Sequence, residues 1–209
     1  MAEPRTATVT TLPNLLGIGR IAATPVIIAL LLLDGRGTDL AAAIIFFFAG
    51  MSDLVDGRIA RSRNQVTPLG VFMDLAADKI LTAGVLIAMV EVNLVPTWIA
   101  ATILVRELVV QAIRQLAAVE HVVISARSLG KAKTVATLGG MGGLLLAADA
   151  RTGGPLAATG VGPALELAGF WLLVIGTVLT VVSGLIYLRG AWPILIGGPA
   201  AADGASASD

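Results

Sequence analysis

The segment Leu167–Leu188 is mostly apolar and contains no charged residue. A helix needs about 20 mostly apolar residues to cross the hydrocarbon core of a bilayer, and this segment meets that requirement unaided. The whole chain is 56% hydrophobic and 13% charged, with a mean hydropathy of +0.91. Ordinary soluble domains are far less apolar. The sequence therefore predicts an integral membrane protein.

Five further apolar segments reach spanning length when the charged residues within them are counted in. They are Leu15–Leu33, Leu40–Gly57, Pro68–Val90, Pro96–Ala117 and Gly130–Ala148. Charge at membrane depth is costly unless it faces a wet or paired interior, so we expect these charges to share one polar cavity. We predict an all-α fold with six transmembrane helices in one catalytic domain, residues 1–190. Residues 197–209, "GGPAAADGASASD", are mostly small and polar, and we expect a disordered tail over residues 191–209.

Basic residues are distributed unequally between the two sides of such a bundle. The termini and the loops after the second and fourth segments hold Arg5, Arg58, Arg61, Arg63, Arg127, Lys131, Lys133 and Arg189. The opposite loops hold Arg36 and Arg151. Because cytoplasmic loops carry an excess of Lys and Arg, both termini are predicted to be cytoplasmic. The protein would then be integral to the cytoplasmic (inner) membrane.

The formal charge and the cysteine content bear on which binding partners and which metal sites the protein can have. The formal net charge is zero, so nothing in the composition indicates a nucleic-acid partner. There is no cysteine, which excludes a disulfide framework and a thiolate metal site.

Four aspartates lie at the end of the second apolar segment and in the first half of the third. Asp53 and Asp56 are three residues apart, and Asp74 and Asp78 are four apart, so each pair shares one face of a helix. The short segment between the two helices lets the four carboxylates converge. Like charges repel strongly in a low-dielectric site, and oxygen ligands favour Mg²⁺ or Mn²⁺, so we expect two such ions. The alternative is an acidic rim at a membrane surface.

Small residues lie close to these aspartates. Gly57, Ala60 and Gly70 would let a ligand approach the backbone, and Arg61 and Thr67 are suited to binding phosphate oxygens. The alternative is that the small residues serve helix packing.

These residues together carry a family resemblance. The pattern is Asp53-x2-Asp56-Gly57-x2-Ala60-Arg61-x8-Gly70-x3-Asp74-x3-Asp78, and it resembles the full signature of the CDP-alcohol phosphotransferases, membrane enzymes of phospholipid synthesis. The resemblance implies a six-helix, usually dimeric fold with a cytoplasm-facing site. It implies that Asp53, Asp56 and Asp74 bind metal, and that Asp78 is the general base and also contacts metal. It further implies that Gly57, Arg61 and Thr67 bind the CDP portion of the donor, CDP-diacylglycerol.

Basic residues in the second half of the chain bear on the acceptor alcohol. Arg106 and Arg114 are about two helical turns apart and share one face. Arg127 lies just before the fifth segment, and Lys131 and Lys133 lie at its start. An anionic acceptor phosphate would account for basic residues gathered near an acidic site. The alternative is cytoplasmic positive charge together with a structural pair between Arg106 and the adjacent Glu107.

The segments "TLPNLLGIGR", "VRELVVQAIR" and "GKAKT" resemble the phosphatidylglycerophosphate synthase branch of that family. The matching residues are Asn14, Arg20, Arg106, Glu107, Arg114, Gly130, Lys131, Lys133 and Thr134. Leu75 stands where the family often has proline, and Gly17 where threonine is common. The resemblance implies that Asn14 and Gly17 contact the donor. It also implies transfer of the phosphatidyl group to sn-glycerol 3-phosphate, giving phosphatidylglycerol phosphate and CMP.

Three alternative functions remain open at this point. Phosphatidylinositol-phosphate synthases of the family also take an anionic acceptor, and cardiolipin synthases take phosphatidylglycerol. A divalent-cation transporter would also use carboxylates, but transporters bind near the bilayer midplane between repeated halves. Here the acids lie near one face, and the second half has no matching acid pair. Release of CMP from CDP-diacylglycerol would distinguish an enzyme from a transporter.

Overall fold

The computed structural model describes residues 12–33, 35–62, 68–120 and 127–196, and its regular structure in these ranges is entirely helical. Six long helices follow one another along the chain. They are α1 (Leu12–Leu32), α2 (Thr38–Ser62), α3 (Pro68–Glu91), α4 (Thr97–Val119), α5 (Arg127–Arg151) and α6 (Gly162–Leu195), with a 3₁₀ turn, η1 (Ala157–Thr159), before α6. Each long helix coincides with one of the six predicted segments, so the all-α prediction is confirmed.

Two helices are long and apolar enough to cross a membrane by themselves. These stretches are Leu15–Leu32 of α1 and Gly162–Pro193 of α6. For the other four helices, membrane crossing stays a prediction. Helix α6 continues to Leu195, so residues 191–195 of the expected tail are helical, and residues 197–209 lie outside the described part of the chain.

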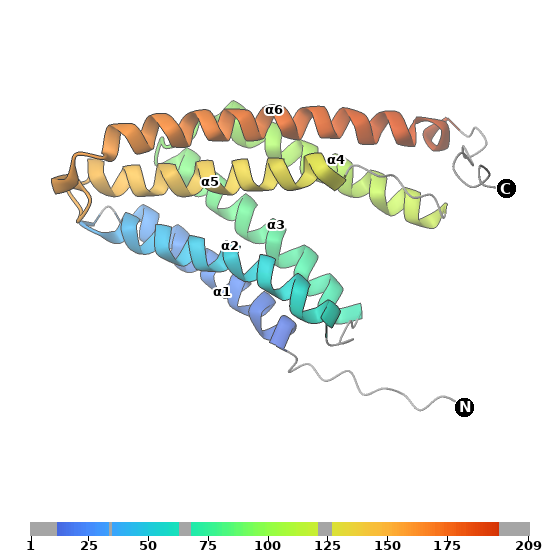
Figure 1. Ribbon diagram of the computed structural model, residues 1–209, viewed down its shortest axis with the longest axis horizontal. Coiled ribbons are helices and arrows are strands. Elements are labelled where there is room, and N and C mark those ends of the chain that lie inside the picture. Colours follow the sequence, from blue (N-terminus) through green and yellow to red (C-terminus); the bar gives the residue numbers. More distant parts are fainter. Residues whose placement is uncertain (1–11, 34, 63–67, 121–126, 197–209) are drawn as a thin grey trace.

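The helices form two groups of three (Figure 1). Helix α1 packs against α2 and α3, and α6 packs against α5 and α4, while α2 lies against α5 and joins the groups. Helices α3 and α4 contact each other over a short stretch only. The first described turn of α1 and the last turn of α6 lie at the same end of the molecule (Figure 1). Side chains of α3, α4 and α5 line a cavity between these helices.

Large apolar side chains both fill the core and cover much of the outer surface. The fully buried ones include Ile27, Leu86, Met89, Ile99, Met141, Leu145 and Leu173. Others are strongly exposed, among them Phe48 (67%), Leu108 (72%) and Ile196 (65%). Soluble monomers rarely expose extended apolar surface. The outer surface is therefore of the kind that lipid covers.

Glycines bring α5 and α6 into backbone contact. A Cβ placed on Gly140 would lie 2.6 Å from the backbone nitrogen of Leu173, and one on Gly143 would lie 3.1 Å from the Cα of Gly169. A Cβ on Gly176 would meet Thr137 of α5 at 2.8 Å. Small residues let membrane helices approach closely, which gains van der Waals contact that larger residues would prevent. We call these contacts the glycine seam.

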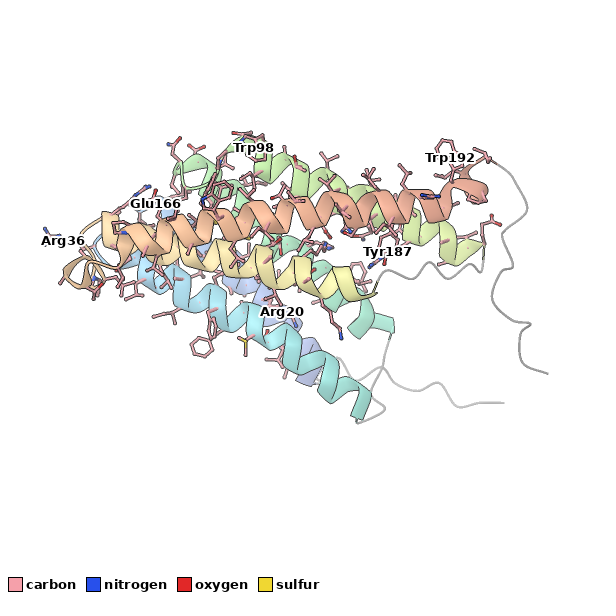
Figure 2. All side chains as sticks on the ribbon, turned by 45° about the horizontal axis from the view of Figure 1, so that its top comes forward. Arg20, Arg36, Trp98, Glu166, Tyr187 and Trp192 are labelled. Carbon is pink, nitrogen blue, oxygen red and sulfur yellow. The ribbon has the colours of Figure 1, made fainter. Side chains whose placement is uncertain are left out.

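Two buried acids accept hydrogen bonds at the end of the bundle near the labelled Arg36 and Glu166 (Figure 2). Asp149 is fully buried, and its Oδ2 accepts a hydrogen bond of 2.9 Å from the backbone N–H of Leu156. The Thr152 hydroxyl donates to Oδ2 of Asp39 at 3.0 Å, which ties the end of α5 to the start of α2. The turn that connects α5 to α6 is thus fixed to both groups of helices.

The glycine seam predicts that the same substitution has opposite effects at two neighbouring positions. Gly140→Ala forces a methyl group against the α6 backbone, so we expect it to destabilise the fold by roughly 1–3 kcal/mol. Gly142→Ala is the matched control, because nothing lies within 4 Å of its added Cβ and alanine favours helix. Thermal unfolding midpoints in detergent micelles should fall for Gly140→Ala alone. Equal midpoints for the two variants would contradict the close packing.

Candidate active site

The two helices that carry the aspartates present them at one end of the bundle. Helix α2 runs through Asp53 and Asp56 to Ser62, and α3 begins at Pro68 and includes Asp74 and Asp78. Each pair therefore has the helical spacing that the sequence predicts. The side chains of three of the four aspartates lie outside the described part, so their convergence stays a prediction.

Asp78 is the aspartate whose side chain is described. It is 41% exposed, and its Oδ2 lies 3.4 Å from the Nζ of Lys79, the next residue along α3. Both residues line a cavity of about 610 Å³ between α3, α4 and α5. Asp78 thus lies in the wall of this cavity with a partly exposed side chain.

Most of the exposed surface of the cavity wall is apolar, although about half of the residues that line it are polar or charged. The polar and charged lining residues are Asp78, Lys79, Thr82, Glu107, Gln111, Gln115, Lys133, Thr134, Thr137 and Thr180. A largely apolar pocket with a small number of convergent polar groups is typical of a ligand site. The predicted orientation of a polar cavity toward the cytoplasm stays a prediction.

Glu107 of α4 binds cations from two other helices and from its own neighbour. Its Oε2 accepts from Lys79 of α3, and its Oε1 accepts from Lys133 of α5. Arg106 donates from Nη1 to Oε1 at 2.7 Å. The side chains of Glu107, Arg106 and Lys133 are 15%, 10% and 16% exposed, whereas that of Lys79 is 36% exposed. Three cations around one carboxylate leave two positive charges beside Asp78. We call these four residues the Glu107 cluster.

Arg106 is anchored to α6 rather than directed into the cavity. Its Nε donates to the carbonyl oxygen of Thr180 at 2.9 Å, and its Nη2 donates to Ser183 Oγ at 2.6 Å. Gly184 leaves room for this side chain, because a Cβ there would lie 3.0 Å from Arg106 Cγ. Arg106 is not among the residues that line the cavity. Its expected role in binding the acceptor phosphate stays a prediction.

Arg114 also points to α6. Its Nη2 donates to the Tyr187 hydroxyl at 2.7 Å, and its guanidinium lies 4.8 Å from the centre of the Tyr187 ring. Tyr187 is labelled in Figure 2, toward the end of α6 that also bears Trp192. Since Arg106 and Arg114 both contact α6, the prediction that they share one face of α4 is confirmed.

Of the other residues expected to bind the acceptor or the donor, the structure describes some and leaves the rest outside its described part. Lys131 is exposed, while Gly17 packs against Met73 of α3, at 3.5 Å between a Cβ built on the glycine and that of Met73. Gly70 is partly buried and makes an interaction of its own. The side chains of Asn14, Asp53, Asp56, Ala60, Arg61, Asp74 and Arg127, the surroundings of Gly57 and the whole of Thr67 lie outside the described residues.

Two features near the aspartates escaped sequence reasoning. Arg20 of α1 is buried and donates from Nε to Ser52 Oγ at 3.0 Å, immediately before Asp53 in α2. Lys79 takes part in the Glu107 cluster, although the sequence gives no sign of which helix it faces. Its position directly after Asp78 is the one feature of the sequence that places Lys79 near the site.

A model of the CDP-alcohol phosphatidyltransferase family matches residues 10–182. The chain is 38% identical over 147 residues to the CDP-diacylglycerol–glycerol-3-phosphate 3-phosphatidyltransferase of Bacillus subtilis (strain 168), covering 65% of this chain and 76% of that protein. It is 33% identical over 190 residues to the protein of the same name from Yersinia pestis (strain Pestoides F), covering 88% of this chain and 97% of that protein.

A third relative carries a different name. The chain is 31% identical over 208 residues to a cardiolipin synthase (CMP-forming) of Oryza sativa subsp. japonica, covering 93% of this chain and 61% of that longer protein. The family model matches most of the chain, from before α1 into α6, and includes both aspartate helices. The chain therefore belongs to the CDP-alcohol phosphatidyltransferase family.

Proposed function

We propose that this enzyme transfers the phosphatidyl group of CDP-diacylglycerol to sn-glycerol 3-phosphate, giving phosphatidylglycerol phosphate and CMP. Membership of the family supports the donor and the class of reaction. Two relatives at 33% and 38% identity bear the name of this activity. The single structural observation that supports the acceptor is the Glu107 cluster, which brings positive charge to a cavity beside Asp78.

The transfer needs a base for the attacking hydroxyl. In the proposed step the acceptor oxygen forms a bond to the phosphorus of the phosphatidyl group. The bond from that phosphorus to the oxygen of CMP breaks, and CMP leaves with the electron pair. Asp78 accepts the hydroxyl proton, since its carboxylate lines the cavity in which the acceptor would lie. Mass and charge then balance without any further reactant.

Asp53, Asp56 and Asp74, together with Asp78, would bind the metal, which we propose to be two Mg²⁺ or Mn²⁺ ions. The donor set fits hard cations, because it consists of carboxylate oxygens in a chain without cysteine. Bound ions would neutralise phosphate charge and stabilise the departing CMP. The helical register of both aspartate pairs supports a shared site.

The donor would lie where α1, α2 and α3 meet. We propose that Asn14, Gly17, Gly57, Ala60, Arg61, Thr67 and Gly70 contact its CDP portion. The contact between α1 and α3 at Gly17 supports this, because it brings the start of α1 toward the helix of Asp74 and Asp78. Arg106, Arg114, Arg127, Lys131 and Lys133 would provide the positive charge that attracts the acceptor.

We further propose that all six helices cross the membrane, with both termini and the site on the cytoplasmic side, and that the enzyme is a homodimer. The distribution of basic residues supports the orientation, and exposed apolar side chains on every long helix support insertion. An amphiphilic donor could then keep its acyl chains in the bilayer while its pyrophosphate reaches the aspartates.

Cardiolipin synthesis is the second candidate function, and the similarity to the rice protein favours it. The two functions differ in acceptor: a small phosphate monoester or the lipid phosphatidylglycerol. The compact cluster of two lysines beside Asp78 fits a small dianion better, because a phosphate monoester carries about −1.5 to −2 charges at neutral pH.

An acceptor panel tests the proposed function directly. Purified protein with CDP-diacylglycerol and Mg²⁺ should release CMP and form phosphatidylglycerol phosphate when sn-glycerol 3-phosphate is added. Lipid products should be identified by mass spectrometry. Turnover with phosphatidylglycerol or inositol phosphate in its place would establish the cardiolipin or phosphatidylinositol-phosphate alternative. Absence of CMP with every acceptor would overturn the assignment.

Asp78→Asn should lower kcat by about 10²- to 10⁴-fold, because an amide cannot take up the hydroxyl proton. Glu166→Gln is the control, since Glu166 is an exposed acid whose ion pair with Arg151 lies at the opposite end of the bundle. CMP release and the thermal midpoint should both be measured. Asp78→Asn activity near that of the control would remove Asp78 as the base.

Removal of divalent cations by EDTA should abolish CMP release, and Mg²⁺ or Mn²⁺ should restore it. Binding of Mn²⁺, followed by electron paramagnetic resonance without substrate, should be lost in the Asp53→Asn/Asp56→Asn double variant. Unchanged Mn²⁺ binding in that variant would place the metal elsewhere. Full activity in EDTA would show that the reaction needs no such ion.

A further inference from the structure

Glu107 has no part in the proposed bond-making step, yet its carboxylate accepts hydrogen bonds from three cationic side chains. Its two carboxylate oxygens take different lysines, with Lys79 on Oε2 and Lys133 on Oε1. The lysines come from α3 and α5, on either side of the cavity, and all three residues line it. One carboxylate therefore fixes the positions of two ammonium groups that would otherwise repel each other.

Arg106 fixes the carboxylate in turn. It donates to Oε1 of Glu107, while its other donors bind Thr180 and Ser183 of α6. Because Arg106 is 10% exposed and bonded to α6, Glu107 has a rigid support on one side. The lysines have more freedom, since Lys79 is 36% and Lys133 16% exposed. Hydrogen bonds thus connect α6 to the two lysines through Arg106 and Glu107.

Lys79 has a second carboxylate within reach. Its Nζ lies 3.4 Å from Oδ2 of Asp78, so Asp78 and Glu107 compete for one ammonium group. If Glu107 were absent, repulsion from Lys133 and Arg106 would drive Lys79 toward Asp78 or into solvent. Glu107 therefore determines whether Lys79 stays in the cavity wall.

We propose that Glu107 is a positioning residue, which holds Lys79 and Lys133 as a two-lysine receptor for the phosphate of the acceptor beside Asp78. The proposal rests on the proposed function, because it takes the acceptor to be a phosphate monoester. The cluster leaves two positive charges, which match the charge of that group. Two charge-assisted hydrogen bonds from fixed donors also orient the phosphate, so that the acceptor hydroxyl is presented to Asp78.

A role in positioning and a role as a simple counter-ion predict opposite results for one substitution. Glu107→Gln removes a negative charge. As a counter-ion alone, Glu107 opposes anion binding, and its removal would lower KM for sn-glycerol 3-phosphate. As a positioning residue, its removal lets the lysines separate, and we expect KM for sn-glycerol 3-phosphate to rise about 10- to 100-fold. KM for CDP-diacylglycerol should change less than about threefold.

The Glu107→Asp variant distinguishes the effect of side-chain length from the effect of charge. Aspartate keeps the negative charge but is shorter, so it cannot contact both lysines in their present positions. We expect KM for sn-glycerol 3-phosphate to rise in this variant as well. Lys79→Met, which leaves Glu107 paired with Lys133 and Arg106, should have the same effect and provides the test if Glu107→Gln fails to fold. The double variant Glu107→Gln/Lys79→Met should be no worse than Glu107→Gln alone.

The matched control is Glu120→Gln, an exposed acid at the C-terminal end of the same helix. Binding of sn-glycerol 3-phosphate and of inorganic phosphate should be measured by calorimetry without donor, so that the result does not depend on turnover. Both ligands should bind more weakly to Glu107→Gln and to Lys79→Met than to the control. Unchanged or tighter binding, or equal increases in KM for both substrates, would overturn the proposal.

The same measurements separate failure of this proposal from failure of the proposed function. If the wild-type protein releases CMP with a different acceptor and binds neither phosphate ligand, the function is wrong and the receptor with it. If the wild type forms phosphatidylglycerol phosphate but the Glu107 and Lys79 variants bind sn-glycerol 3-phosphate normally, the function stands and the positioning role is wrong.

Discussion

The walls of the cavity are joined by one carboxylate, Glu107, which binds three cations. Helices α3, α4 and α5 each contribute a charge to this point, and α6 supports it through Arg106. Isolated charge in an apolar bundle is expensive, and pairing removes most of that cost. The pairing here joins the two groups of helices at a place where α3 and α4 otherwise diverge. The same contacts that hold the walls together thus supply the positive charge of the cavity.

Much of the fold could be predicted from the sequence because apolar length determines where membrane helices form. The six predicted segments agree with the helices to within a few residues, except that α2 continues through Ser62 and α6 through Leu195. Those ends carry charge or proline, which lowers the apolar signal without breaking the helix. The spacing of Asp53 and Asp56, and of Asp74 and Asp78, was also readable, because a helix repeats every 3.6 residues.

The partners of charged side chains could not be predicted in this way. Periodicity placed Arg106 and Arg114 on one face but did not reveal that this face meets α6. The pair of Arg106 and Glu107 looked self-contained in the sequence, whereas Glu107 also binds Lys79 and Lys133 from distant helices. Such contacts depend on how helices cross, and helix crossing leaves no local mark in a sequence. Similarly, Gly139 and Gly143 indicate close packing but not the identity of the partner.

The glycine seam limits which amino acids the chain can accept where α5 and α6 meet. At most core positions a larger side chain can be accommodated if a neighbour becomes smaller. A Cβ on Gly143 would lie nearest to the Cα of Gly169, and one on Gly140 nearest to the backbone nitrogen of Leu173, and no substitution in α6 removes these backbone atoms. No second substitution in α6 can therefore make room for a larger side chain at Gly140 or Gly143. Exposed apolar positions such as Phe48 and Ile175 can vary among apolar residues, whereas Gly140 and Gly143 cannot be replaced by a larger residue without moving the α6 backbone.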